Sequence, residues 1–175
     1  MTAVADALEM NKVESHLHPE GSFDVDAHEV PKGREEVWRF TPLKRLHGIH
    51  NDAPFADGAT KVEVEAADGV TVETVAADDD VRGASGLVPT DRVSARAWAA
   101  STGATLVRIP TDTVVDGATV IRHHGTGSET AGAGHAVIVA EKFSKATVAL
   151  VFEGSAVVAD NIEIVVEDEI GRAHV

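Results

Sequence analysis

Histidines and carboxylates near the start of the chain form the first group that could do chemistry. His16 and His18 are two residues apart, a spacing that would point both imidazoles the same way on a strand, and Glu14 and Glu20 are close in sequence. Imidazole and carboxylate groups bind divalent metals, so this group is a candidate metal site. It lacks a spaced third ligand, and a His-x-His pair beside a proline is common in exposed segments. A structural role is therefore the favoured interpretation, and a small His-based metal-binding module built on His16 and His18 is an alternative.

Two further histidine groups give weaker signals. His47 and His50 are three residues apart at the end of a predicted short helix, a weak signal unless the fold places a carboxylate or a further histidine beside them. His123 and His124 precede a glycine-rich segment, residues 125–134, which His135 follows. That segment lacks the Gly-Lys-Ser/Thr of a phosphate-binding loop, the third glycine of a dinucleotide-binding turn and a following helix. We therefore interpret it as a solvated connection between strands.

Carboxylates and hydroxyls add no recognisable catalytic motif. Glu141, Glu153 and Asp160 could supply a general acid and base, but nothing in the sequence places two of them across a substrate. The acids at positions 24–29 lack the glycine that a calcium-binding EF-hand loop has at its sixth position, where this chain has Glu29. We assign no catalytic, cofactor-binding or metal-binding residue from the sequence, and the chain is not expected to be an enzyme.

Composition limits the classes of protein to which the chain can belong. Its 175 residues are 43% hydrophobic and 25% charged, which is typical of a globular protein. The 15 basic residues against 29 acidic ones give a net charge of −14, which disfavours nucleic-acid binding. There is no cysteine, so disulfides and thiolate sites are excluded. No apolar run is long enough to span a membrane, and the first residues do not resemble a secretion signal, so we expect a cytoplasmic location and no membrane partner.

Helical signals are confined to the first part of the chain. Residues 1–57 are rich in proline and histidine and predict helix and irregular structure. Thr41 and Pro42 predict the start of a short helix packed through Leu43, Leu46 and Trp38. A second helix is predicted over Thr90–Ser101, with Thr90 or Asp91 as its cap.

Apolar residues alternate with polar ones over residues 61–75, on both sides of Ala67-Asp68-Gly69. A three-residue turn with a left-handed glycine would pair Val64 with Val72 on one face, so the sequence predicts a β-hairpin here.

Short valine-rich and isoleucine-rich runs dominate the chain after Gly103, with no helix-length amphipathic segment between them. This pattern predicts a mainly β structure, and periodicity alone does not separate a sandwich, a barrel and a parallel β-helix. We favour the β-helix, because its coils need no large aromatic core.

Three segments, taken in order, resemble the SufB/SufD family of iron–sulfur cluster assembly proteins. Trp38, Thr41, Pro42 and Leu43 match the Trp-x-x-Thr-Pro-Leu motif of that family. The run from Ala140 to Val148 and the run from Ala159 to Glu163 are similar to its β-helix. With residues 15–24 ahead of both, the chain is most similar to actinobacterial SufD.

The resemblance implies both a fold and a mode of action. It implies a helical and irregular N-terminal region over residues 1–104 and the start of a right-handed parallel β-helix over 105–169. It also implies a scaffold subunit that acts without catalysis beside a SufB-like paralogue and a SufC-like ATPase, with the iron–sulfur cluster associated with the full complex. The partner-contacting and cluster-proximal residues are expected in a C-terminal half that this chain lacks.

Two other expectations remain from the sequence. Residues 170–175 match one reading frame of a common sequencing adapter, so we expect a non-native tail on a truncated β-helix. A polysaccharide-active β-helix enzyme is the other alternative function, motivated by the valine-rich runs and the scattered acids.

Overall fold

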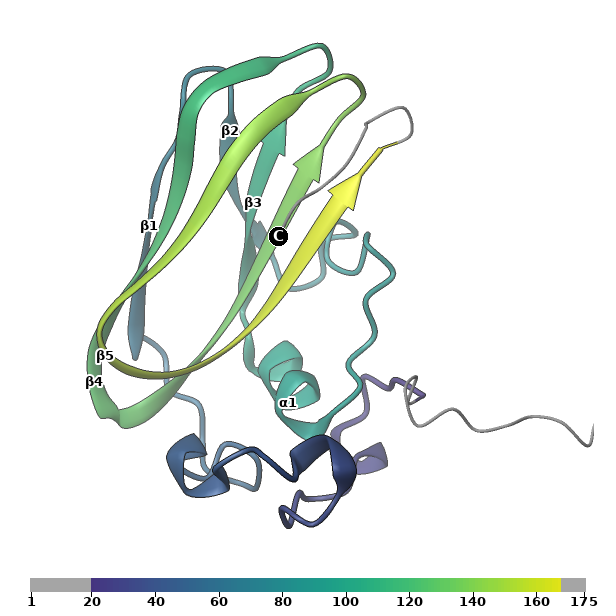
Figure 1. Ribbon diagram of the computed structural model, residues 1–175, viewed down its shortest axis with the longest axis vertical. Helices are drawn as coiled ribbons and strands as arrows, with labels where there is room; N and C mark the ends of the chain where they lie inside the picture. The colour runs from purple at the N-terminus through teal and green to yellow at the C-terminus, as the bar shows by residue number, and fades with distance from the viewer. Residues whose placement is uncertain (1–19, 168–175) are drawn as a thin grey trace, which may run out of the picture.

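The computed structural model describes residues 20–167, and in that range the chain is mainly β (Figure 1). Five strands form one strongly curled sheet, in which β1 (Thr60–Glu65), β4 (Val114–Ala140), β3 (Gly103–Ile109) and β2 (Thr71–Ala76) are neighbours in that order. The fifth strand, β5 (Lys145–Val166), also pairs with β4. No helix in the described range is long and apolar enough to cross a membrane.

The two long strands, β4 and β5, determine the shape of the molecule. They pair in parallel, from Val114 opposite Lys145 at one end of the ladder to Ala140 opposite Val166 at the other. Both strands bend at the same level, so that the first and second halves of each strand face each other across the curl (Figure 1). The first half of β4 pairs antiparallel with β1, and its second half pairs parallel with β3. The curl is half of a barrel rather than a closed one.

Glycines allow the two strands to bend together. Gly125 lies opposite Gly154 in the ladder, and a Cβ at Gly125 would collide with the backbone of Ser155. The predicted loop over 125–134 is instead part of β4, and its glycines let the strand curve. Residues 125–127 and 131–134 pair with β5, while residues 128–130 have no partner in that strand. The ladder shifts register in two places, between Val114 and Ala118 and between Gly127 and Ala131, where β4 carries extra residues.

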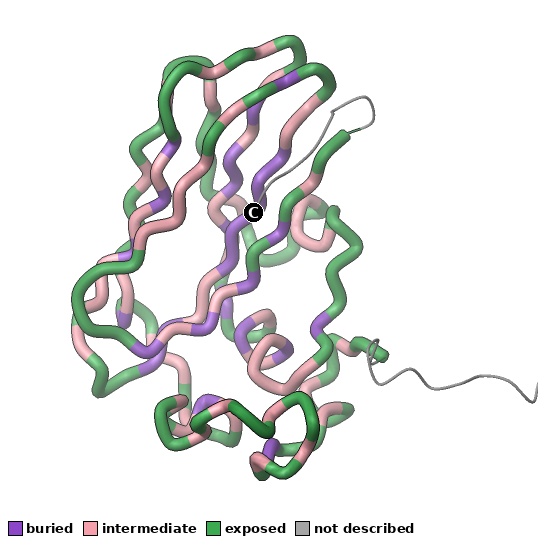
Figure 2. The backbone as a smooth tube through the Cα atoms, in the orientation of Figure 1, coloured by how far each residue is buried: buried purple, intermediate pink, exposed green. Residues whose placement is uncertain are grey.

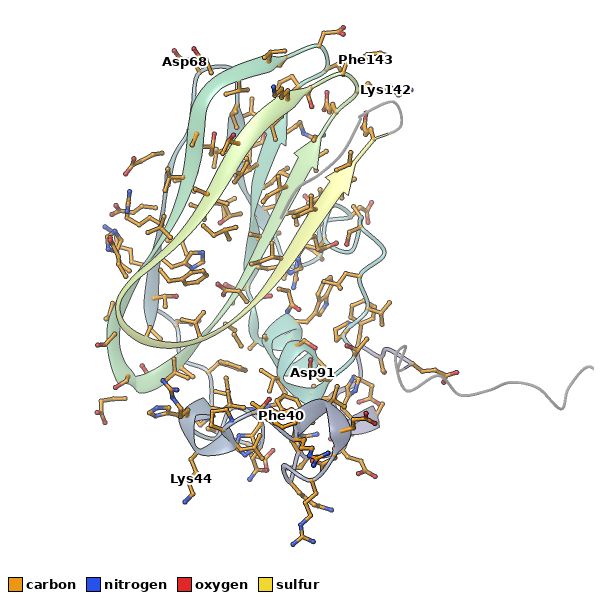
Figure 3. All side chains as sticks on the ribbon, viewed as in Figure 1. Phe40, Lys44, Asp68, Asp91, Lys142 and Phe143 are labelled. Atoms are coloured by element: carbon orange, nitrogen blue, oxygen red, sulfur yellow. The ribbon has the colours of Figure 1, made fainter. Side chains whose placement is uncertain are left out.

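Two similar turns connect β3, β4 and β5 at the far end of the curl from the helices. Asp112 and Phe143 take the same position in these turns, both with left-handed backbone (φ 57° and 59°). The turns stack, because the Asp112 amide donates to Lys142 and the Lys145 amide donates to Thr113. Figure 3 shows Lys142, Phe143 and Asp68 at this end and Asp91, Phe40 and Lys44 at the other.

Helical segments close the opposite end of the curl. Helix α1 spans Arg92–Ala100, and the Asp91 side chain accepts hydrogen bonds from the Val93 and Ser94 amides, so the predicted helix and one of its two predicted caps are confirmed. From residue 20 onward, three single 3-10 turns precede it: η1 (Val25–Ala27), η2 (Glu36–Trp38) and η3 (Leu43–Leu46). The predicted Thr41-Pro42 helix is thus confirmed only as one turn, and Pro42 caps it in place of Thr41.

The predicted β-hairpin is wrong, and of its turn only the left-handed glycine is confirmed. Gly69 has φ 89°, but the Val70 amide donates to the Ala67 carbonyl, so the turn encloses Asp68 and Gly69 alone and not the predicted three residues. The two strands do not pair with each other, since Val64 lies opposite Ile121 of β4 and Val72 opposite Val107 of β3. Each strand gains a longer partner on its own side of the curl, and this overrides the local pairing.

Buried residues are concentrated in the strands and in α1 (Figure 2), and they form clusters on both surfaces of the sheet. One cluster inside the curl contains Val107, Ile109, Ile121 and Ile138. Another, around Ala97, Val157 and Ala159, packs α1 against the outside of the second halves of β4 and β5. Strands from the expected N-terminal region thus share one sheet with the expected β-helix segment, and the expected tail over 170–175 lies outside the described residues.

Candidate functional site

A buried histidine–aspartate pair lies inside the curl, near the bend. His123 comes from the first half of β4 and Asp160 from the second half of β5, and their Nδ1 and Oδ2 atoms are 3.4 Å apart. Their side chains are only 7% and 8% exposed. Three buried atoms of this pair have no hydrogen-bond partner within residues 20–167: both ring nitrogens of His123 and the Oδ2 atom of Asp160. Such groups are unusual in a folded protein and call for an explanation.

The ladder between β4 and β5 positions both side chains. His123 lies opposite Phe152, and their rings stack with centroids 4.6 Å apart. Asp160 lies opposite Gly134, where any Cβ would collide with the carboxylate. Only glycine at position 134 leaves room for Asp160 in this orientation.

A cavity of about 440 Å³ opens beside the pair. Phe152 and Ile162, which both line it, are 57% and 38% exposed, so it is accessible at the outer edge of β5. Burial raises the pKa of Asp160, and the attraction of His123 and His135 opposes this rise. The other residues that line the cavity are Thr60, Gly125, Glu153, Gly154, Ala156 and Val158.

A second polar cluster lies on the outer surface of the sheet, around Glu163. His135 Nε2 is 2.7 Å from Glu163 Oε1, and both side chains are completely buried. Glu163 also accepts hydrogen bonds from the Gly83 amide (2.7 Å), the Ser85 amide (3.1 Å) and the Ser85 hydroxyl (2.6 Å). Arg82 donates from Nε to His135 Nδ1 (3.2 Å), and its guanidinium lies 4.7 Å from the centre of the Trp98 ring.

These contacts determine the protonation of the cluster. An arginine nitrogen can only donate, so His135 Nδ1 is an acceptor and the proton is on Nε2, facing Glu163. Burial lowers the pKa of His135, and Glu163 opposes this effect while Arg82 adds to it. Burial alone would raise the pKa of Glu163, but the hydrogen bonds from Ser85, Gly83 and His135 outweigh it and lower the pKa.

The Glu163 cluster holds the structure together and offers no access to a ligand. Arg82 also donates to the Trp98 carbonyl (3.1 Å) and the Ser101 hydroxyl (2.8 Å), so the cluster joins the loop before α1, the end of α1 and both long strands. Its buried acceptors are already used. The His123–Asp160 pair, with free buried atoms beside an open cavity, is the stronger candidate site.

The other residues considered from the sequence are dispersed. The three candidate catalytic carboxylates meet different partners: Glu141 pairs with Arg108 (3.0 Å), Glu153 with His124 (2.9 Å) and Asp160 with His123. His47 ends η3 with a left-handed backbone, and His50 Nδ1 is buried without a partner in the described range. His16 and His18 lie outside the described residues. In residues 20–167 no three His, Asp or Glu side chains gather closely enough to hold a metal.

Sequence reasoning misses the central residues of the Glu163 cluster and does not bring His123 and Asp160 together. Arg82 and Glu163 carry no functional motif, because their roles depend on contacts between segments 53 to 80 residues apart. The sequence indicates Asp160 only as a candidate catalytic acid and His123 only as one of two histidines before a glycine-rich segment. Gly134 is the available signal, because a glycine opposite an acid on the neighbouring strand leaves room for the carboxylate. That signal can be used only once the pairing register between β4 and β5 is known.

Comparison with known proteins places the chain beside longer sequences. It is 40% identical over 168 residues to a Mycobacterium tuberculosis protein named "Iron-sulfur cluster assembly SufBD family protein", and these residues cover 96% of this chain and 41% of that protein. A Mycobacterium leprae protein of the same family name is 43% identical over 148 residues, covering 83% of this chain and 37% of the relative. The chain thus spans about two fifths of the length of these relatives. No protein-family model and no solved structure matches it.

Proposed function

We propose, from the premise that this chain belongs to the SufBD family of iron–sulfur cluster assembly proteins, that it is part of a scaffold subunit of that machinery. The observation that carries the proposal is 40% identity over 96% of the chain to relatives bearing that family name. The proposed subunit is SufD-like, acts in the cytoplasm with a SufB-like paralogue and a SufC-like ATPase, and catalyses no reaction itself. The cluster is its cargo, held by the full complex.

Two features of this chain support the proposal, one at the level of the family and one at the level of the subunit. Trp38, Thr41, Pro42 and Leu43 follow a motif of the SufB/SufD family as a whole. The chain has no cysteine, so any thiolate ligand for a cluster would have to come from a partner or from a part of the protein outside these residues.

The partner assignment is tested by co-purification. The full gene product that contains this chain is expressed with the SufB-like and SufC-like proteins of the same organism, with an affinity tag on the SufC-like protein alone. We expect all three proteins to elute together and to stay together in size-exclusion chromatography. If the gene product elutes alone while the other two still associate, the proposed role is wrong.

We also propose that β4 and β5 are the first coils of a parallel β-helix that continues in longer relatives. This proposal is supported by the two parallel ladders, in which residues 31 apart pair on both sides of the turns (Ile109 of β3 with Ala140, and Val114 with Lys145). Along β5 the offset falls to 26 residues (Ala140 with Val166), because β4 carries extra residues at its two register shifts. Among the described residues β5 pairs only with β4, and apolar side chains near its edge, including Ile162 and Ile164, are 38% exposed. An unpaired edge of this length is a template for another strand.

The β-helix proposal predicts that a lysine at position 162 destabilises the full gene product more than the 175-residue chain. Ile162→Lys should destabilise the 175-residue chain by less than about 1 kcal/mol, because the side chain has access to water. In the full gene product a further coil would cover position 162, and the buried lysine should cost at least about 2 kcal/mol. Val114→Lys is the control, since Val114 is 73% exposed and should change little in either protein. Urea unfolding measures all four variants, and an equal cost of Ile162→Lys in both proteins would refute the further coil.

A further inference from the structure

The distance between His123 and Asp160 fits a shared metal ion better than a hydrogen bond. Their Nδ1 and Oδ2 atoms are 3.4 Å apart, yet within the described chain these atoms make no hydrogen bond to each other or to another group. With metal–ligand bonds of about 2.0–2.2 Å, two neighbouring ligands in a tetrahedral zinc site are about 3.3–3.6 Å apart. The two side chains are therefore already at the separation that a bound ion would require.

The surroundings of the pair also suit a cation. Both side chains are more than nine-tenths buried, so they are held in place by packing, and the cavity of about 440 Å³ leaves space on the open side. Phe152 stacks on the imidazole of His123, and the absence of a Cβ at Gly134 leaves room for the carboxylate of Asp160. The two proposed ligands come from opposite halves of the curl. Among the residues that the structure describes, no lysine or arginine lines the cavity to neutralise Asp160.

We propose that His123 and Asp160 bind a first-row divalent transition-metal ion, with the remaining coordination positions open to the cavity and filled by water. Imidazole together with one carboxylate suits zinc, cobalt and iron(II). Two protein ligands leave the site accessible to a third donor from outside the described residues. The proposal rests on the geometry of this pair and does not depend on the proposed scaffold function.

Zinc binding by the 175-residue chain tests the proposal. Because His16 and His18 could bind metal independently, the experiment uses a His16→Ala/His18→Ala background, freed of metal, with isothermal titration of zinc chloride at pH 7.5. We expect one zinc ion per chain. Asp160→Asn and His123→Gln should each weaken binding at least about tenfold. His124→Gln is the matched control, because His124 is the next residue of β4, faces the opposite side of the strand and does not line the cavity, so it should leave binding unchanged.

Cobalt and thermal stability give independent readouts. Cobalt(II) bound at the site should show the intense visible bands of a four-coordinate ion, and these should disappear in Asp160→Asn. Excess zinc should raise the melting temperature of the background protein but not that of Asp160→Asn, since only a ligand bound to the folded state stabilises it. Asp160→Asn removes no hydrogen bond from the free Oδ2 atom, so it keeps the test decisive even if His123→Gln fails to fold.

Three results would overturn the proposal. The first is no zinc binding in the background protein, which would mean that water alone satisfies the pair. The second is binding that Asp160→Asn leaves unchanged. The third is binding that His124→Gln abolishes, which would place the metal on the outer surface.

Discussion

Replacing Glu163 by glutamine tests whether the buried cluster stabilises the fold through its charge. The substitution keeps the shape of the side chain and turns one of its two oxygens into an amide nitrogen. Oε1 accepts from the Gly83 amide and from His135, and Oε2 accepts from the amide and the hydroxyl of Ser85. The cost of the substitution depends on which oxygen is replaced.

The contacts of His135 decide the orientation of the new amide. If nitrogen replaced Oε1, it would face two donors, and His135 could not change tautomer because Arg82 donates to its Nδ1 atom. If nitrogen replaces Oε2, the Ser85 hydroxyl can rotate to accept, and only the Ser85 amide loses its partner. Glutamine should therefore adopt the second orientation.

The expected cost follows from these contacts. The lost amide partner accounts for about 1 kcal/mol, at the low end of the usual range because Ser85 is near solvent. The bonds from Gly83 and His135 lose their charge assistance, about 1 kcal/mol each. Glu163→Gln should thus lower the free energy of unfolding by about 2–3 kcal/mol at pH 7.5. Glu153→Gln is the control, since that carboxylate is 43% exposed and should cost about 0.2–1 kcal/mol.

Urea unfolding followed by far-UV circular dichroism measures both variants. The folded state holds the pKa of Glu163 below its ordinary 4.5, so the stabilisation from its charge is present above pH 4.5 and is lost as the pH falls through the folded-state pKa. The gap between wild type and Glu163→Gln should therefore narrow below pH 4.5. A cost no larger than that of Glu153→Gln, or a gap that stays constant on acidification, would refute this reasoning.

Three further predictions concern the two polar clusters. Because folding lowers the pKa of His135, the stability that its neutral form contributes is present above pH 6.5 and is lost as the pH falls. His135→Gln should therefore make the free energy of unfolding less dependent on pH below pH 6.5, by up to about 1.4 kcal/mol per pH unit in urea titrations. Because folding raises the pKa of Asp160, its ionised form lowers the stability of the protein at neutral pH. Asp160→Asn should therefore raise the melting temperature at pH 7.5 in the presence of a chelator, and this gain should shrink as the pH falls towards 3.8. A lower melting temperature for Asp160→Asn would contradict the prediction. Gly134→Ala should cost about 1–3 kcal/mol through its collision with Asp160, and a double-mutant cycle with Asp160→Ala should recover most of that cost, whereas simple additivity would show that the collision is not the cause.

Local signals predicted the elements that depend on neighbouring residues. Asp91 begins α1 because its side chain accepts from the Val93 and Ser94 amides, and Gly69 forms its turn because it is left-handed. The mainly β class followed from the valine-rich runs. In each case the cause lies within a few residues of the signal, so the sequence is sufficient.

Long-range pairing explains what the sequence could not predict. The strands on both sides of Gly69 could pair with each other or with longer neighbours, and the alternation of apolar residues is the same in both arrangements. Glu163 belongs to a strand of alternating isoleucines and becomes a buried acceptor only because Gly83 and Ser85 are folded over it. His123 and Asp160 meet only through the bend of both long strands.

The second register shift of β4 is a position at which residues can be inserted into the strand. Between Gly127 and Ala131 the strand carries three residues that have no counterpart in β5, and these residues, 128–130, are exposed. Pairing resumes on both sides of them, so a peptide inserted there would loop into solvent without moving His123 or His135. The segment is therefore the natural position for an epitope tag or a fluorescent label, and a position where homologous chains can gain or lose residues while keeping the same ladder.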